Sequence, residues 1–294
     1  MSLHVRFWGT RGSVPTPGRS TRHYGGNTTC VEIRRGDSVF LCDAGTGIRN
    51  AGDELVRRGL DGVGLHILFS HTHWDHIQGF PFFAPAYEAG RTVHLWAVPG
   101  WGERVERLLS EQMQEEYFPV AFTQLGAAIE TAELPADPVE IGGVVVGHHP
   151  VPHPGGCSAF SFSADGHKVV YMTDAEIDAL LDDVDATFAD PDAPRSLPAS
   201  LVEFVRGADL LIGDGQYTDA TYAAHQGWGH PRITTMVDLA IAAGVGQLAV
   251  THHDPSESDP EVEHKLRRAR ERATRVGANL SVFGAREDLQ LELG

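Results

Sequence analysis

Residues 70–76 read Ser-His-Thr-His-Trp-Asp-His, a dense run of side chains that bind metal ions. The run follows a largely apolar segment that we expect to be a buried strand. Alternate residues of an extended segment point the same way, so His71 and His73 can bind one ion. Asp75 and His76 come after the chain has turned and can face a second ion. Imidazole suits zinc, and a mixed set of histidine and carboxylate ligands favours a catalytic site over a structural one.

The pattern His-x-His-x-Asp-His resembles the signature of the metallo-β-lactamase superfamily. This resemblance implies three further ligands in a fixed order, each at the end of a strand: a histidine, an aspartate and a late histidine. The chain offers His153, Asp174 and His252 in this order, each beside an apolar run.

The resemblance therefore implies a dinuclear centre. Its ligands would be His71, His73 and His153 for one ion, Asp75, His76 and His252 for the other, and Asp174 as the bridge. We expect two Zn²⁺ ions, with Mn²⁺ as the alternative. Three neighbouring histidines rank lower as ligands: His148, His149 and His253.

The apolar patterns also predict the elements that position these residues. Strands are expected at 5–8 (in an alternating segment that begins at Met1), 29–33, 39–42, 65–70, 93–98, 144–148, 159–163, 169–173, 210–212, 248–251, 281–283 and 289–293. Helices are expected at 48–58, 103–114, 201–206, 232–243 and 261–276. This order favours an α/β fold with two sheets between helical layers. The resemblance makes it a four-layer αββα metallo-β-lactamase sandwich. We expect one domain over 1–294, with the acidic, proline-rich stretch 178–200 as an exposed excursion.

Composition limits the classes of protein that this chain can represent. Its 294 residues with 41% hydrophobic content suffice for a large core, and no stretch approaches a membrane span. Three scattered cysteines suit a reducing compartment, so we expect a cytoplasmic protein that does not contact a membrane. Cys30 and Cys42 lie in apolar runs and are expected to be core residues.

The net charge of −17 bears on the substrate. Proteins that follow a nucleic-acid backbone usually present a basic face, because phosphate contacts supply much of the affinity. The one dense basic cluster, at 265–275, alternates with acids as a solvated helix face does. Polymeric nucleic acid is therefore a poor candidate partner.

Two later strings resemble the tRNase Z-like phosphodiesterases of the superfamily. One is the apolar run that ends in Gly213-Asp214-Gly215, and the other is Gly229-His230 before an expected helix. The resemblance implies that His230 donates a proton to the leaving oxygen and that Asp214 orients it. The usual acid of that branch is Glu with a neighbouring His, so Asp214 after Gly213 is a departure that leaves its role open. Asp75 counts as catalytic as well as a ligand.

The N-terminal strings at 9–15 and 24–29 resemble bacterial members of this branch that act on cyclic nucleotides or small cyclic phosphates, and both are expected to border the site. We therefore expect a phosphodiesterase in which a water shared by two ions attacks a small phosphodiester, with a homodimer implied by the resemblance. The alternatives are a tRNA 3′-end endonuclease and a metal-binding regulator without activity. The ligands alone also allow a glyoxalase-type hydrolase. Tyr117 and Phe118 could form a wall for a base or could simply pack a helix down. The sequence leaves the nucleobase open.

Overall fold

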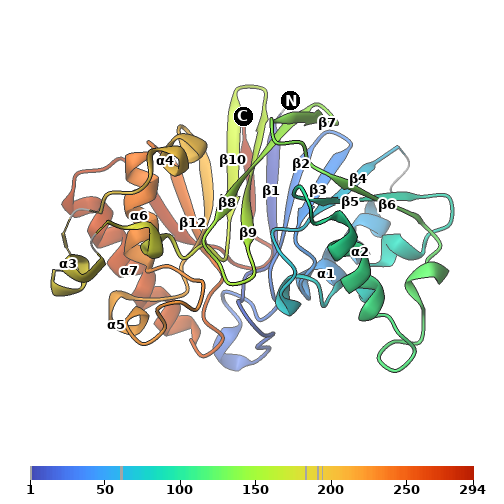
Figure 1. The fold of residues 1–294 in the computed structure, drawn as a ribbon, viewed down its shortest axis with the longest axis horizontal. Helices are drawn as coiled ribbons and strands as arrows, with labels where there is room; N and C mark the ends of the chain where they lie inside the picture. Colours follow the sequence, from blue (N-terminus) through green and yellow to red (C-terminus); the bar gives the residue numbers. More distant parts are fainter. Residues whose placement is uncertain (1, 60–61, 183, 191, 194) are drawn as a thin grey trace.

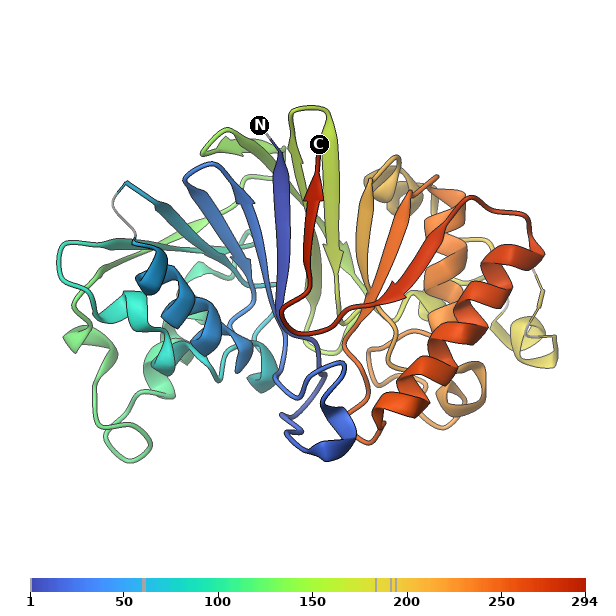
Figure 2. The ribbon, with the colours of Figure 1, turned by 180° about the vertical axis from the view of Figure 1, so that it is seen from behind.

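Two β-sheets pack face to face in the computed structural model, and helices cover the outer face of each (Figure 1). The structure describes residues 2–59, 62–182, 184–190, 192–193 and 195–294. The view from behind shows the same layers, with the two groups of helices on opposite sides of the sheets (Figure 2). The expected αββα arrangement is therefore confirmed.

The first sheet has seven strands in the order β14-β1-β2-β3-β4-β5-β6. Its strands are β1 (Leu3–Gly9), β2 (Cys30–Arg35), β3 (Ser38–Cys42), β4 (Gly64–Leu68), β5 (Thr92–Ala97), β6 (Ala128–Glu133) and β14 (Gln290–Leu293). Strands β14 to β3 pair antiparallel, and β3 to β6 pair parallel. The pairing of β1 with β14 brings the first and last strands together, and the marked chain ends lie near each other in both views.

The second sheet repeats this plan in the order β13-β12-β11-β10-β9-β8-β7. Its strands are β7 (Val139–Ile141), β8 (Val144–Val151), β9 (Cys157–Ala164), β10 (His167–Met172), β11 (Leu210–Asp214), β12 (Gln247–Thr251) and β13 (Ser281–Gly284). Strands β7 to β10 pair antiparallel, and β10 to β13 pair parallel.

The helices divide between the two outer faces. The first sheet carries α1 (Gly47–Arg58) and α2 (Gly102–Glu111), and the second carries α4 (Ala199–Val205), α6 (Ile233–Ala242) and α7 (Asp259–Arg275). Two short helices, α3 (Val184–Ala189) and α5 (Asp219–Tyr222), lie in the connections.

Helix α7 shows how the sequence specifies such a helix. Ser258 precedes it, and both its backbone N–H and its hydroxyl donate to the Glu261 carboxylate, so the first turn is capped. Val262, Leu266 and Ala269 recur at helical spacing and are fully buried against the second sheet.

Apolar side chains fill three layers, one between the sheets and one beneath each set of helices. The central layer is rich in aromatic rings such as Phe7, Phe40, Phe160 and Phe162. Cys30 and Cys42 are buried, as expected for core residues. Within the described part of the chain, no helix is long and apolar enough to cross a membrane.

All expected strands and helices are present, with boundaries that differ by a few residues. Two strands were not anticipated: β6 lacks a strong apolar alternation, and β7 has only three residues. Met1 of the expected first strand lies outside the described residues.

The expectation of an exposed excursion at 178–200 holds for most described residues of the stretch, which are exposed or half-buried, but not for its charged anchor points. Asp178 is fully buried, and its carboxylate accepts hydrogen bonds from the backbone N–H and Nε of Arg232 at 2.7 and 2.8 Å. The Arg195 side chain is also buried and pairs with Asp219 at 2.9 Å. Apart from residues 183, 191 and 194, which lie outside the described part, this stretch includes segments anchored to the second sheet's helices by buried ion pairs.

Candidate metal centre

The residues singled out in the sequence meet where strands of both sheets end. The 70–76 segment follows β4, Asp174 follows β10, and His252 follows β12. Parallel neighbours such as β10, β11 and β12 end at one edge of their sheet, so side chains that follow them are brought together.

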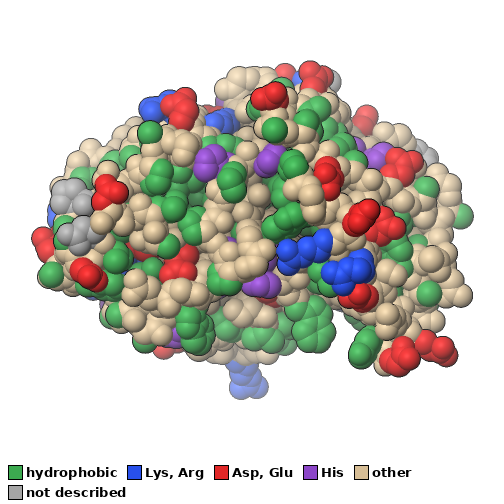
Figure 3. Space-filling model, viewed as in Figure 1, with side chains coloured by type: hydrophobic (Ala, Val, Ile, Leu, Met, Phe, Trp, Pro, Cys, Tyr) green, Lys and Arg blue, Asp and Glu red, His purple; other side chains and the backbone are tan. Residues whose placement is uncertain are grey.

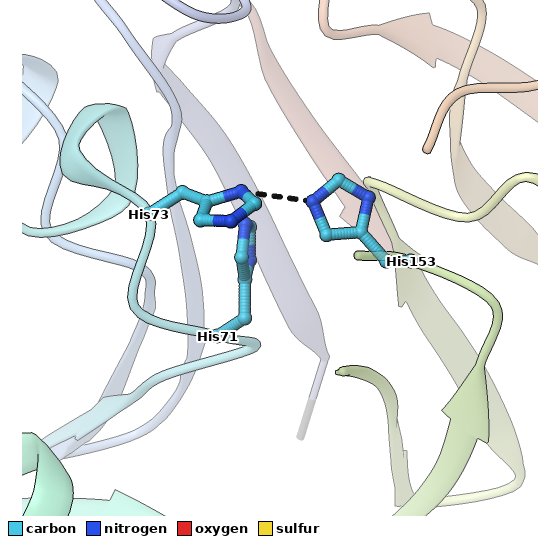
Figure 4. Close-up of side chains that lie close together, drawn as sticks. All are labelled: His71, His73 and His153. Carbon is cyan, nitrogen blue, oxygen red and sulfur yellow. Dashed lines mark hydrogen bonds between the residues drawn. The ribbon is translucent and has the colours of Figure 1, made fainter. Parts of the chain in front are cut away.

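His71, His73 and His153 form the first group (Figure 4). His73 Nδ1 lies 2.9 Å from His153 Nε2, and the His71 ring lies 4.5 and 4.7 Å from the other two ring centres. The loop between β8 and β9 places His153 here, 80 residues from His73 in sequence. These spacings allow three nitrogens to contact one ion.

Asp75, His76 and His252 form the second group. Asp75 Oδ2 lies 3.3 Å from His76 Nε2 and 3.4 Å from His252 Nε2. All three residues are buried.

Asp174 lies between the two groups and turns one oxygen toward each. Its Oδ1 lies 3.8 Å from His71 Nε2 and 3.7 Å from His153 Nε2. Its Oδ2 lies 3.1 Å from His76 Nε2 and 3.2 Å from His252 Nε2. This is the arrangement that a carboxylate shared by two cations requires.

The far nitrogen of most of these rings is held by a hydrogen-bond acceptor. His76 Nδ1 donates to Asp43 Oδ2 (2.8 Å), and His252 Nδ1 donates to Gln216 Oε1 (2.9 Å). His153 Nδ1 donates to the Gly229 carbonyl (2.9 Å). His71 Nδ1 lies 3.1 Å from Ser70 Oγ, whose own proton goes to Asp43. A proton on Nδ1 leaves the Nε2 lone pair free to bind a cation, as is common for metal-binding histidines.

Four atoms that face the space between the groups have no hydrogen-bond partner among the described residues, although they are buried: Nε2 of His71, His76 and His252, and Oδ2 of Asp174. Buried polar atoms nearly always have a partner. A cluster of such atoms, all of them typical metal ligands, fits a site for divalent cations.

The electrostatics agree with this interpretation. Burial lowers the pKa of His71, His73 and His153, so these imidazoles are neutral and can coordinate. Burial alone would raise the pKa of Asp75, but His76 and His252 hold it below the ordinary value. Burial also opposes the charged form of His76, yet Asp174, Asp75 and Asp43 together raise its pKa. The carboxylates therefore favour positive charge around His76, while the first group of imidazoles stays neutral.

The structure also brings together His230 and Asp214, as the sequence implied. His230 Nδ1 lies 2.8 Å from Asp214 Oδ2. Burial disfavours the charged ring, but Asp214, with Asp174 and Asp75, raises the pKa of His230 to about 9. Asp214 also accepts the backbone N–H groups of Asp174 (3.0 Å) and Gln216 (2.9 Å), so it positions the bridging residue too.

Asp43 is a site residue that the sequence analysis missed. Its buried carboxylate accepts hydrogen bonds from the Ser70 backbone and hydroxyl at 2.7 Å and from Tyr171 at 2.6 Å, besides His76. Asp43 directly follows β3 and so occupies a strand end, as Asp174 does, but Gly45 two residues later suggested only a turn. Asp43, Asp174 and His252 all have positive φ (62°, 53° and 56°), a strained backbone that tends to occur at functional sites.

The N-terminal string at 9–15 forms one wall of the centre, as expected. The Ser13 backbone N–H donates to Asp75 Oδ2 at 2.7 Å. Gly12 lies so close to the His252 ring that a Cβ at this position would come within 2.4 Å of it. The loop therefore fixes two ligands of the second group.

The lower-ranked histidines lie elsewhere. His148 and His253 bind the backbone carbonyls of Pro135 and Ala285, and the His149 ring packs beside Phe204. The ranking that placed His153 and His252 in the cluster agrees with this geometry.

A cleft of about 580 Å³ opens above the cluster. Its lining includes Asp75, His153 and Asp174, the His230 ring, and the exposed rings of Trp74 and Trp228. A ligand in this cleft would contact the cluster and His230 together.

Comparisons with known proteins give the same assignment. A family model described as the beta-lactamase superfamily domain matches residues 39–253. A ribonuclease Z of Haloarcula marismortui is 22% identical over 293 residues, covering 86% of each chain. The crystal structure of a diphosphatase of the PhnP family superposes with a TM-score of 0.67 at 19% identity, covering 99% of this chain and 98% of the other. The short form of human tRNase Z gives a TM-score of 0.62 at 17% identity and covers 99% of each chain.

Proposed function

Because the chain belongs to the metallo-β-lactamase superfamily, we propose that it is a metal-dependent hydrolase of small phosphodiesters, with a cyclic nucleotide as the favoured substrate. The observation that carries this proposal is the position of Asp174 between two groups of histidines, beside the His230–Asp214 pair. Metal ligands and a proton donor at one cleft suit the cleavage of a phosphate ester.

The proposed ligands are His71, His73 and His153 for one ion, Asp75, His76 and His252 for the other, and Asp174 for both. The fitting ions are two Zn²⁺, with Mn²⁺ as the alternative. When bound by these residues, two such cations would lower the pKa of a water molecule and stabilise charge on the attacking and leaving oxygens. The side chains behind the ligands fix the imidazoles through their far nitrogens, so the donor atoms are in position before a substrate arrives.

His230 is the proposed proton donor. An alkoxide is a poor leaving group, and a nearby histidine can protonate it as the bond breaks. The contact of Nδ1 with Asp214 makes Nε2 the ring nitrogen available to the cleft. Asp214 fixes the orientation of the ring.

The second candidate is a tRNA 3′-end endonuclease, and the names of relatives such as ribonuclease Z favour it. The net charge of −17 favours a small substrate instead. Figure 3 shows acidic side chains across one face of the molecule, with Lys and Arg confined to a few places. A regulator that binds metal without turnover would need neither His230 nor its carboxylate partner.

A substrate panel tests the proposal. Protein reconstituted with Zn²⁺ or Mn²⁺ is assayed with bis-p-nitrophenyl phosphate, cyclic mononucleotides and a precursor tRNA. The proposal expects hydrolysis of the first two classes and little cleavage of the third. Specific 3′ cleavage of the tRNA would support the endonuclease, and no turnover of any substrate by fully loaded protein would support the regulator.

A further inference from the structure

A second cavity, of about 590 Å³, lies next to the metal cleft. Its lining includes the rings of Trp74, Phe82, Tyr117 and Phe118, which we call the aromatic groove. The groove lies on the side of the first sheet, at the end of α2, whereas His230 comes from the segment before α6 on the second sheet. The metal cluster therefore lies between the groove and the proposed proton donor.

Trp74 connects the two cavities. It stands between His73 and Asp75 in the sequence, and its side chain borders both the metal cleft and the aromatic groove. The residue is 72% exposed, so the indole does not fill the core. A molecule bound at the metal cluster could extend past Trp74 without leaving the surface of the protein.

The other rings are also available for contact. Tyr117 is 78% and Phe82 is 57% exposed. Phe118 packs edge to face against Phe82 at 5.3 Å and so supports that ring. Tyr117 is too exposed to pack the helix down, whereas Phe118 is partly buried against the core beneath the helices of the first sheet, as the packing alternative expects. A cluster of large exposed rings is a mark of a binding surface.

The chemistry of the groove selects a neutral aromatic group. No Lys or Arg occurs among the described residues that line it, and the charge present is the carboxylate of Glu111. A phosphate would be repelled here. Aromatic faces stack on a planar ring. The amide nitrogens of Gln78 and Gln112 donate to Thr28 Oγ1 and the Ile77 carbonyl, so their side-chain oxygens are the atoms that can accept hydrogen bonds from the edge of such a ring.

We propose that the aromatic groove binds a neutral aromatic group of the phosphodiester that remains attached to phosphorus while the leaving oxygen lies at His230. This inference rests on the proposed function and deepens it. It makes the enzyme selective for esters that carry a planar ring, which in a cyclic nucleotide is the nucleobase on the one sugar that holds both ester oxygens.

Two esters with the same leaving group test the inference: methyl p-nitrophenyl phosphate and phenyl p-nitrophenyl phosphate. The wild type should prefer the phenyl ester. Tyr117→Ala, Phe82→Ala and Trp74→Ala should each reduce the phenyl-to-methyl ratio of kcat/KM by about 5–100-fold, mainly through KM, the range of one stacking contact. Val276→Ala removes an exposed apolar side chain just after helix α7, on the second sheet's side of the molecule, and should leave the ratio unchanged. Metal content is measured for each variant, because Trp74 adjoins two proposed ligands.

A binding measurement separates the groove from the catalysis. Diphenyl phosphate should bind the metal-loaded protein more tightly than dimethyl phosphate, and Tyr117→Ala should remove the difference. If neither ester is hydrolysed but diphenyl phosphate still binds more tightly than dimethyl phosphate, the groove assignment is supported and the proposed function is wrong. If the esters are hydrolysed and no groove variant changes the ratio, the groove assignment is wrong. A lower mass of Tyr117→Ala at sedimentation equilibrium would assign the groove to a second copy of the chain and would also overturn the inference.

Discussion

Asp214 holds His230 through a single oxygen, since Oδ2 lies 2.8 Å from Nδ1 of the ring and also accepts the backbone N–H of Asp174 at 3.0 Å. The proposed proton donor and the bridging carboxylate therefore share one buried support. A displacement of Asp214 would misplace both.

Replacing His230 by Ala should lower turnover of alkyl phosphodiesters by about 10²–10⁴-fold, the usual reach of general acid catalysis, while metal content is retained. The loss should be much smaller for p-nitrophenyl esters, because that leaving group departs without a proton. Steady-state kinetics on both classes, with metal analysis of each preparation, measures this contrast. Equal losses on both classes with metal retained would exclude a proton-donor role, and loss of metal would make His230 a ligand.

Replacing Asp174 by Ala should reduce binding at both metal positions, because each of its oxygens faces a different group of ligands. His71→Ala should weaken one position first. Metal stoichiometry after reconstitution with zinc distinguishes the two outcomes. His149→Ala is the control, because this histidine lies outside the cluster beside Phe204 and should keep the full metal content.

Replacing Asp43 by Asn should lower metal affinity by about 10–100-fold, the usual effect of removing the partner behind a ligand. The amide cannot serve as the charged acceptor that His76 Nδ1 meets at 2.8 Å. Tyr171→Phe removes a different hydrogen bond to the same carboxylate and should cost about 1 kcal/mol of stability while metal binding is kept. Titration calorimetry and thermal unfolding of both variants provide the test, and unchanged affinity in Asp43→Asn would remove Asp43 from the site.

Replacing Gly12 by Ala should impair the second ligand group, because the new Cβ would come within 2.4 Å of the His252 ring. Either the loop or the imidazole must move, at a cost of about 1–3 kcal/mol, typical of overpacking. Gly18→Ala is the matched control in the same loop, where the nearest atom would lie 3.9 Å from the Cβ. Zinc titrations should show weaker binding for Gly12→Ala alone.

Precursor tRNA should be cleaved poorly at physiological salt, because an acidic surface gains little from contacts with phosphates. Gel analysis of the 3′ end over a range of salt concentrations measures this. Efficient cleavage at the 3′ end of the acceptor stem would support the tRNA endonuclease over the hydrolase of small phosphodiesters.

Much of the site could be anticipated because its ligands follow strands, and an apolar run followed by a polar ligand is visible in the sequence. His71 was found in this way, and the resemblance to the superfamily then pointed to Asp174 and His252 at later strand ends. Asp43 was missed because it contacts no substrate or proposed ion directly. Its role depends on His76, which lies in the segment after the neighbouring strand β4. A carboxylate that supports another side chain carries no spacing pattern of its own.

The parts of the fold that escaped prediction depend on partners far along the chain. Strand β6 is a half-exposed edge strand that forms because β5 offers a free parallel edge, so its own sequence shows little alternation. Segment 178–200 is mostly exposed or half-buried, as its acidic residues suggest, but Asp178 and Arg195 form buried pairs with Arg232 and Asp219. Local composition cannot reveal a partner of this kind.

The pairing of β1 with β14 has a consequence for how the chain is made. On the ribosome, β1 emerges before the other strands of its sheet and can pair with β2 early, but its other partner, β14, is made after all of them, since Leu3 pairs with Leu293. Until then one side of β1 keeps unpaired backbone groups, and such an edge invites association with other chains. Contacts of long sequence separation also form slowly. The first sheet can therefore be completed only once residues 290–293 have emerged, so until then nascent chains should need protection of this edge.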